Sequence, residues 1–495
     1  MLSAPGGFHI DLQPGFLRSM NRVSPHQIDF LKSALAFDSP ISPNASLTDW
    51  ILQRRSSVKV RVEKVDLGIL RQWSIDSNTG YLSHYTGRFF SIVGIRVRTN
   101  WGQVHQWDQP IINQAEVGYL GFIAKKFENT LHLLVQAKIE PGNANIVQLS
   151  PTLQATKSNY TQAHRGARPR YLEYFNGEIA TKVLVDQLQS EQGARFLRKR
   201  NRNIVSQVRE TEDVPITDDF RWLTIGQLKR LMARDSVVNM DSRTVLSCLG
   251  FGYYSDESLR ALYALAPRTT KGQWAIDTAL NGERAHHDFS TILSWISGLK
   301  AAYDLEVLRI PLHAVKDWEI GDQIIQRTDK KYFSVIGVKT EIANREVTSW
   351  DQPMIEPAQE GLVAFLVKPI NGVLHFLVQA KLEPGNFDVI ELAPTVQCLT
   401  GNYRIGQNEY SVPYIHEVLE APKDQILFDS MQSEEGGRFF REENRSMIVM
   451  VDELFPIDTY PNFCWMTLNQ MYRFVEFNNY LNISARSLMA CFPFA

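Results

Sequence analysis

The chain has 495 residues, 44% of them apolar and 21% charged, a composition typical of a globular protein too long for one hydrophobic core. Its 52 basic and 54 acidic side chains leave a formal charge of -2, which excludes the basic surface of a general nucleic-acid binder. We find neither a secretory leader pattern nor an apolar run of about 18 residues, and so expect a cytoplasmic protein that does not enter a membrane. Four scattered cysteines predict reduced thiols and no metal site.

An internal repeat organises the chain. WDQP at 107–110 recurs at 350–353, an offset of 243 residues, and LHLLVQAKIEPGN (131–143) recurs as LHFLVQAKLEPGN (374–386). At the same offset SEQGARF (190–196) becomes SEEGGRF (433–439), whereas upstream of Phe89 the offset is 245 because the first copy has two extra residues. Self-similarity of this length indicates a duplicated domain.

The repeat predicts the domain organisation. We expect an N-terminal extension at 1–45, a first repeat at 46–251, a linker at 252–289 and a second repeat at 290–495. The linker contains the helical pattern SLRALYAL (258–265), closed by Pro267.

Within the first repeat, in chain order, the pattern predicts a helix at 46–55 and strands at 88–99, 109–114, 118–127 and 131–140. Two helices are predicted after them, at 186–200 and 224–234. Each copy is therefore expected to be α+β, a mixed sheet with packed helices. Neither GxGxxG nor GxxxxGK[ST] opens a helix, so neither NAD nor ATP is predicted, and we expect no cofactor.

The strand at 131–140 carries a row of polar side chains. Its odd-numbered residues are apolar, whereas His132, Gln136, Lys138 and Glu140 point to the other face. The second copy repeats these residues as His375, Gln379, Lys381 and Glu383. Such a row can contact one small ligand, or it can form a buried structural network, and the repetition does not decide between the two.

Differences between the copies point to a site in the first one. Residues 164–170 read HRGARPR, and the equivalent 407–413 read QNEYSVP, so His164, Arg165, Arg168 and Arg170 lose their counterparts. Guanidinium groups donate paired hydrogen bonds to phosphate oxygens, so this loop is a candidate diphosphate site, with a solvated basic loop as the alternative. Three further differences are Arg88, which becomes Lys331, His84, which has no counterpart, and Glu116, which becomes Gln359.

Aromatic residues are frequent in the same region. Trp107, Tyr160 and Tyr171 are among those that could stack on a nucleobase, although most such residues are expected to lie in the core.

Together these motifs resemble the NDP-hexose 2,3-dehydratase family. The matching segments are TGYLSHYTGRFF (79–90), WDQPIINQAEVGYLG (107–121), LHLLVQAKIEPGN (131–143) and QLSPTLQATKSNYTQAHRGARPRYLEYF (148–175). The resemblance implies two tandem Nudix-like domains, a homodimer, and a role in deoxysugar and antibiotic biosynthesis. It also implies a nucleotide-sugar pocket in each half, of which one is productive. The acidic REUxEE helix of a hydrolytic Nudix enzyme is not evident, which disfavours metal-dependent hydrolysis.

The reaction implied by the resemblance is loss of the C2 hydroxyl from dTDP-4-keto-6-deoxy-D-glucose. A base removes the C3 proton, a donor stabilises the enolate, and an acid protonates the departing hydroxyl, giving a 3,4-diketo-2,6-dideoxyhexose. We expect Glu140 to be the base, Lys138 the enolate donor, and His84 or Tyr160 the acid. Alternatively, Lys138 and Glu140 serve binding or folding while His84, Glu116 and His164 transfer the protons.

The remaining assignments follow the same resemblance. Arg88, Arg165, Arg168 and Arg170 would hold the diphosphate, and the other substrate-binding candidates are Trp107, Gln136, Asn159, His164 and Tyr171. The second-copy pocket would use Gln379, Lys381, Glu383, Asn402 and Tyr403. A labile diketo product predicts metabolite hand-off to a 3-ketoreductase.

Either pocket can borrow side chains from the other repeat or from a dimer mate. The alternative functions are a Nudix-type nucleotide-sugar hydrolase and a non-catalytic nucleotide-sugar-binding protein.

Overall fold

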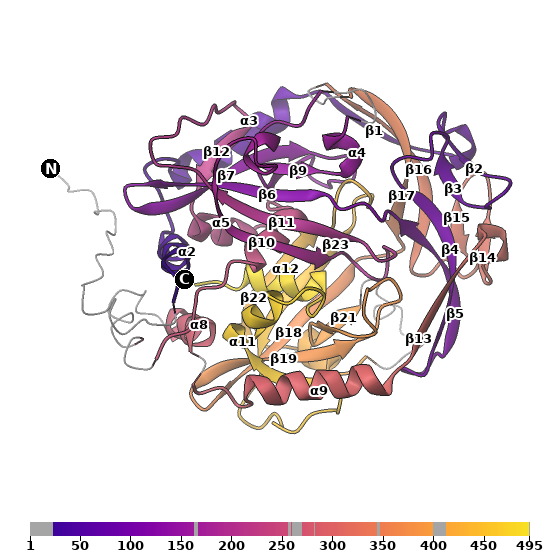
Figure 1. Ribbon diagram of the computed structural model, residues 1–495. Coiled ribbons are helices and arrows are strands. Elements are labelled where there is room, and N and C mark those ends of the chain that lie inside the picture. Colours follow the sequence, from indigo (N-terminus) through magenta and orange to yellow (C-terminus); the bar gives the residue numbers. More distant parts are fainter. Residues whose placement is uncertain are drawn as a thin grey trace.

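A computed structural model describes residues 23–162, 167–255, 259, 270–281, 283–343, 347–398 and 412–494. The described chain is α+β, with two halves of equivalent topology (Figure 1). Each half contributes a seven-stranded mixed sheet, and a five-stranded antiparallel sheet lies to one side of each.

The two large sheets have the same strand order, which agrees with the duplication seen in the sequence. The first has the order β10-β11-β6-β7-β12, and the second has β22-β23-β18-β19-β24. One pair in each sheet is parallel, β6 with β11 and β18 with β23, and the other pairs are antiparallel. The strands of the first sheet are β6 Tyr119–Phe127, β7 Thr130–Ile139, β8 Val147–Ser150, β9 Leu153–Ala155, β10 Lys182–Ser190, β11 Arg200–Gln207 and β12 Phe220–Leu223. Those of the second are β18 Gly361–Ile370, β19 Val373–Lys381, β20 Glu391–Ala393, β21 Val396–Cys398, β22 Ile426–Ser433, β23 Glu443–Met450 and β24 Phe463–Thr467.

The two small sheets exchange strands between the repeats. The first consists of β2 Trp73–Ile75, β3 Leu82–His84, β4 Ser91–Thr99 and β5 Gln106–Asn113, with β13 Leu305–Ile310 from the second repeat. The second consists of β14 Trp318–Ile320, β15 Ile325–Arg327, β16 Phe333–Ile342 and β17 Ser349–Pro357, with β1 Val60–Val65 from the first repeat. In Figure 1 the indigo β1 lies beside the orange β16. Each repeat therefore completes a sheet of the other.

Helices cover the large sheets and join the halves. They are α2 Pro25–Leu35, α3 Asn44–Ser57, α4 Lys157–Tyr160, α5 Ile225–Met232, α6 Met240–Ser247, α8 Thr270–Leu280, α9 Phe289–Ala302, α10 Ile415–Leu419, α11 Leu468–Val475 and α12 Ile483–Cys491. α6 packs against α12 across the halves, where Arg243 and Arg486 are almost fully buried. The Arg243 guanidinium donates to the Ser433 carbonyl oxygen, and that of Arg486 donates to the Ser190 carbonyl oxygen, so each arginine binds the other repeat. These bonds explain why the sequence repeats the arginine of this helix.

The structure confirms several predicted elements and corrects one. The predicted helices at 46–55 and 224–234 are α3 and α5, and the four predicted strands are β4 to β7. The predicted helix at 186–200 is wrong, because β10 continues to Ser190 and a turn follows it until β11 begins at Arg200. Pairing of β10 with β11 and docking of the turn on the other repeat override the local helical pattern.

The segments outside the predicted repeats also contain helices. α2 lies in the predicted extension and α8 in the predicted linker, and they make equivalent bonds. The Ser33 hydroxyl donates to the Leu131 carbonyl oxygen at 2.6 Å, and the Thr278 hydroxyl donates to that of Leu374 at 2.6 Å. Most of the pattern at 258–265 lies outside the described residues.

Two predictions from composition can also be compared with the structure. Cys248, Cys398, Cys464 and Cys491 are free thiols. No helix in the described part of the chain is long and apolar enough to span a membrane.

Candidate active site

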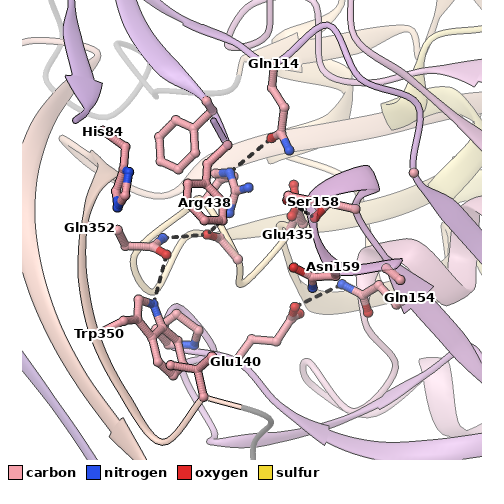
Figure 2. A pocket seen from close by; sticks show the side chains of 18 of the residues that line it. His84, Gln114, Glu140, Gln154, Ser158, Asn159, Trp350, Gln352, Glu435 and Arg438 are labelled. Carbon is pink, nitrogen blue, oxygen red and sulfur yellow. Dashed lines mark hydrogen bonds between the residues drawn. The ribbon is translucent and has the colours of Figure 1, made fainter. Parts of the chain in front are cut away.

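A cavity of about 250 Å³ lies between the two repeats. Its walls come from segments far apart in sequence, and Figure 2 shows Trp350, Gln352 and His84 along one side and Gln154, Asn159 and Ser158 along the other. We call it the inter-repeat cavity. It is lined by Gln72, Trp73, His84, Phe89, Phe90, Gln114, Gly118, Leu120, Lys138, Glu140, Pro141, Gln154, Ala155, Thr156, Ser158, Asn159, Lys199, Asn201, Asp241, Val347, Trp350, Asp351, Gln352, Glu435, Gly437 and Arg438.

Two repeated motifs bring the halves together at this cavity. In the EPGN turn, Gly142 N–H donates to the Gly436 carbonyl oxygen at 2.7 Å, and its own carbonyl oxygen accepts from Arg441 N–H at 2.8 Å. A Cβ on Gly142 would lie 1.7 Å from the Phe439 carbonyl oxygen, so only glycine fits here. The equivalent turn, around Gly385, docks on Gly193 in the same way. The motifs EPGN and SExGxRF are therefore repeated because each binds the other across the halves.

The SEEGGRF turn of the second repeat (433–439), which docks on the EPGN turn at Gly142 and is called the docked turn below, carries residues of the cavity. Glu435, Gly437 and Arg438 belong to this turn, which is tied to β17 by a hydrogen bond from Ile355 N–H to the Arg438 carbonyl oxygen at 2.9 Å. On β17, Trp350 Nε1 donates to Gln352 Oε1 at 3.0 Å, and Gln352 Nε2 donates to the Gly437 carbonyl oxygen at 2.8 Å (Figure 2). The WDQP strand and SEEGGRF turn of the second repeat thus form one wall of the cavity.

The end of β7 supplies a lysine and a carboxylate. Lys138 Nζ lies 3.8 Å from Glu140 Oε1, and both side chains are buried. Glu140 Oε1 accepts a hydrogen bond from Gln154 Nε2 at 2.9 Å, and Gln154 Oε1 accepts from Asn239 Nδ2 at 3.1 Å. This chain of bonds fixes the carboxylate at the cavity.

The second repeat builds the same network. Glu383 Oε1 accepts from Gln397 Nε2 at 2.8 Å, Gln397 Oε1 accepts from Asn482 Nδ2 at 2.7 Å, and Lys381 Nζ donates to the Gln397 carbonyl oxygen at 2.7 Å. Gln379 lies earlier on β19 and is half-buried. The repeated lysine and carboxylate are therefore part of a framework common to both halves.

Three carboxyl groups at or near the cavity have raised pKa values: Asp241 and Glu435, which line it, and Glu191, which interacts with Glu435. The pKa of Asp241 lies well above its ordinary value because of burial, and Glu435, Glu191 and Glu140 raise it further. Burial also raises the pKa of Glu435, which Arg438 opposes, and brings the pKa of Glu191 to about 7. Burial lowers the pKa of Lys199. A carboxyl group with a raised pKa can stay protonated near neutral pH and act as a proton donor.

Two cations from different repeats flank the same cavity. The Arg438 guanidinium lies over the Phe90 ring at 4.3 Å, and its Nε donates to Gln114 Oε1 at 3.2 Å. Lys199 Nζ donates to the Glu116 carbonyl oxygen. Among described residues, no group of three or more His, Cys, Asp or Glu side chains could hold a metal ion.

Four of the residues predicted from the sequence line the cavity, namely Lys138, Glu140, His84 and Asn159. His84 Nε2 donates to Gln72 Oε1 at 3.1 Å, and its Nδ1 lies 2.7 Å from the Thr86 hydroxyl oxygen. Burial lowers the pKa of His84. The statement that His84 has no counterpart is wrong, because His84 pairs with Trp73 as Arg327 pairs with Trp318. The two extra residues lie instead in the turn between β2 and β3.

Other predicted residues lie away from the cavity lining. The hydroxyl groups of Tyr160 and Tyr171 donate to the carbonyl oxygens of Val117 and Pro215, at 3.3 and 2.6 Å. Trp107, on β5, donates to Gln109 Oε1 at 2.9 Å, and it is its counterpart Trp350 that reaches the cavity. Gln136, Arg88, Arg168 and Arg170 are also absent from the lining, and Arg168 forms an exposed ion pair with Glu178 at 2.7 Å. His164, Arg165, Asn402 and Tyr403 lie outside the described residues.

The residues that the second repeat contributes to the cavity were not predicted from the sequence. Glu435, Arg438, Trp350 and Gln352 were overlooked because strand exchange and turn docking leave no local signal. Asp241 and Lys199 were also missed, although a comparison of the copies would have found them. Their equivalents at the offset of 243 are Ser484 and Glu442, and that of Glu435 is Gln192.

Comparison with known proteins identifies the family. A family model described as NDP-hexose 2,3-dehydratase matches residues 44–249 and 289–492. The chain is 44% identical over 461 residues to the dTDP-4-dehydro-6-deoxy-alpha-D-glucopyranose 2,3-dehydratase of Saccharopolyspora spinosa, with 93% of each chain covered. Enzymes of the same name from Amycolatopsis orientalis (42% over 447 residues, 89% of this chain and 88% of the relative) and Streptomyces violaceoruber (41% over 455 residues, 91% and 97%) are similar. The chain belongs to the NDP-hexose 2,3-dehydratase family.

Proposed function

We propose that the inter-repeat cavity removes water across C2 and C3 of dTDP-4-keto-6-deoxy-D-glucose, the substrate named for the three relatives. The observation that carries this proposal is the buried pair of Lys138 and Glu140, 3.8 Å apart at the cavity wall. The reaction needs a base beside a cation, because the C4 ketone makes the C3 proton acidic and its removal places negative charge on the C4 oxygen.

Glu140 takes the C3 proton in this scheme, and Lys138 donates a hydrogen bond to the enolate oxygen. The bond from Gln154 to Glu140 orients the carboxylate, and the ammonium group stabilises charge that develops only as the enolate forms. The enolate then expels the C2 hydroxyl. The resulting enol tautomerises to the 3,4-diketone, so the net change is the loss of one water molecule.

Neither His84 nor Tyr160, the two residues predicted from the sequence, suits the role of the acid that protonates the departing hydroxyl. His84 lines the cavity, but its lowered pKa makes it a neutral imidazole near pH 7. The raised pKa of Tyr160 and its bond to the Val117 carbonyl oxygen also argue against proton donation to a ligand. The proposal therefore requires another donor.

The diphosphate is proposed to bind Arg438 and Lys199, the cations of the cavity that are not paired with Glu140. Asn159 is proposed to contact the sugar or the base. Arg88, Arg168 and Arg170 do not line the cavity, so they could contact only a part of the nucleotide that extends out of it.

We further propose that the two repeats are Nudix-like domains. The bounds predicted from the sequence are 46–251 and 290–495, with a linker at 252–289, and the equivalent bonds of α2 and α8 favour moving both starts to near residues 25 and 270. We also propose that the protein forms a homodimer and that its product passes to a 3-ketoreductase. Both proposals rest on the resemblance to the family.

The test is to incubate the purified protein with dTDP-4-keto-6-deoxy-D-glucose in the presence of EDTA and to follow the products by mass spectrometry. A nucleotide sugar lighter by one water, or free dTDP released from the labile product, is expected. Cleavage to a nucleoside monophosphate and a sugar phosphate would instead indicate the hydrolase, and binding without any change in mass would indicate the non-catalytic protein.

A further inference from the structure

Two carboxyl groups of the inter-repeat cavity lack a role in the framework described so far. Asp241 lies in the first turn of α6 and is 3% exposed, and Glu435 lies in the docked turn of the other repeat. Within the described residues, neither carboxyl group has a hydrogen-bond or ion-pair partner, although both line the cavity. Asp241 is buried and Glu435 is half-buried; a buried carboxyl group without a partner costs folding free energy, so Asp241 calls for an explanation.

Asp241 is not needed to begin its helix. The cap of α6 is Asn239, whose side-chain oxygen accepts from Ser242 N–H at 2.9 Å. In the second repeat, α12 begins with the same cap from Asn482 to Ala485 N–H at 2.9 Å, and Ser484 stands in the place of Asp241. The fold therefore forms this helix without a carboxylate.

Glu435 is likewise dispensable for the docked turn. The equivalent turn of the first repeat carries Gln192 at this position, yet it makes the same backbone bond to Gly385 as the Glu435 turn makes to Gly142. At a third cavity position, Lys199 is replaced by Glu442. Asp241 and Lys199 of the first repeat thus meet Glu435 of the second at the inter-repeat cavity, and all three are replaced at their equivalent positions, by Ser484, Glu442 and Gln192.

We propose that Asp241 and Glu435 share one proton and deliver it to the C2 hydroxyl as it leaves, an inference that rests on the proposed dehydratase function. Glu140 removes the C3 proton, the C2–O bond breaks, and the hydroxyl leaves as water with the proton from the pair. In the tautomerisation that follows, C2 gains a proton from Glu140 and the C3 hydroxyl returns its proton to the pair. Every group ends in its starting state.

The surroundings suit a pair that holds a single proton. Burial raises the pKa of both carboxyl groups; Glu435 raises the pKa of Asp241 further, and Glu140 raises the pKa of Glu435. Arg438, Lys199 and Lys138 favour ionisation of Glu435, which makes it the member that carries the negative charge. Asp241 is then the member that carries the proton, as expected for like charges that cannot both ionise.

The experiment compares wild type with Asp241→Asn and Glu435→Gln, using two measurements in D₂O. One follows dehydration, and the other follows exchange of the C3 proton of the substrate with solvent, which needs only the base. We expect dehydration to fall about 10² to 10⁴-fold while exchange continues at the wild-type rate. Ser484→Ala, in the other half, is the matched control and should dehydrate normally.

A second substrate separates acid catalysis from misplacement of the base. In the 2-deoxy-2-fluoro analogue the leaving group is fluoride, a weaker base than hydroxide, so the variants should lose less activity on it than on the natural substrate. Equal loss of exchange and dehydration in a variant that melts like wild type would overturn the proposal, as would undiminished dehydration. If Asp241→Asn does not fold, Asp241→Ser introduces the residue that the second repeat tolerates. A wild-type protein that leaves the substrate unchanged would refute the proposed function itself.

Discussion

The docked turns allow the contribution of each repeat to be tested by one pair of substitutions. In Gly142→Ala the new Cβ would lie 1.7 Å from the Phe439 carbonyl oxygen and 2.7 Å from that of Gly436, and backbone atoms cannot move aside cheaply. Overpacking costs about 1–3 kcal/mol, and the two backbone hydrogen bonds of Gly142 contribute about 1 kcal/mol each. The expected loss is about 3–5 kcal/mol, a large part of the roughly 5–15 kcal/mol that stabilises a typical protein.

Gly385→Ala is the matched variant, because its Cβ would lie 1.8 Å from the Phe196 carbonyl oxygen. Both variants should lower the midpoint of thermal unfolding by similar amounts. Gly142→Ala displaces Glu435 and Arg438 from the inter-repeat cavity and should lower kcat strongly at a temperature at which both variants are folded. Gly385→Ala displaces instead the turn that precedes Lys199, which is assigned to the diphosphate, so it should mainly raise KM. Equal loss of kcat in the two variants would refute the assignment of the chemistry to this cavity.

Three further predictions concern single side chains. Glu140→Gln should reduce both dehydration and C3 exchange about 10² to 10⁴-fold, measured by mass spectrometry and by NMR in D₂O, and retained exchange would exclude Glu140 as the base. Arg438→Ala should raise KM more than Arg168→Ala, because Arg438 lines the cavity and Arg168 is paired with Glu178 at the surface; steady-state kinetics showing the reverse order would return the diphosphate to the basic loop. Because the folded pKa of Asp241 is raised, its contribution to stability is present at low pH and is lost as pH rises from the unfolded value near 3.8 through the folded value. Asp241→Asn should therefore gain stability over wild type as pH rises above 3.8 in thermal scans, and a difference that does not change with pH would contradict the raised pKa.

Much of the fold could be predicted because its signals are local. The alternation along 131–140 predicts β7 and its buried face, and the offset of 243 residues predicts two halves of equivalent topology. The segment 186–200 failed because its apolar residues permit either a helix or a strand, and the choice is made by pairing with β11. A partner that is distant in sequence cannot be read from the segment itself.

The residues of the candidate site that were predicted from the sequence all come from the first repeat. Lys138 lies in β7 and Glu140 directly follows its last residue, Ile139, so their common face followed from the period of two. The repeated EPGN and SExGxRF motifs looked like parts of each copy, whereas their glycines are required for contact between the copies. Tyr171 was predicted as a stacking residue but packs in the core, and its hydroxyl is bound by the Pro215 carbonyl oxygen. Chemical type alone does not distinguish a buried aromatic residue from a ligand contact.

The most direct test of the account is the fate of dTDP-4-keto-6-deoxy-D-glucose with the wild-type protein in D₂O and EDTA, followed in one reaction by mass spectrometry and NMR. The account predicts solvent exchange at C3, loss of one water from the sugar, and deuterium at C2 of the product. A substrate that is bound but keeps both its C3 proton and its C2 hydroxyl, or that is cleaved at the diphosphate, would contradict it.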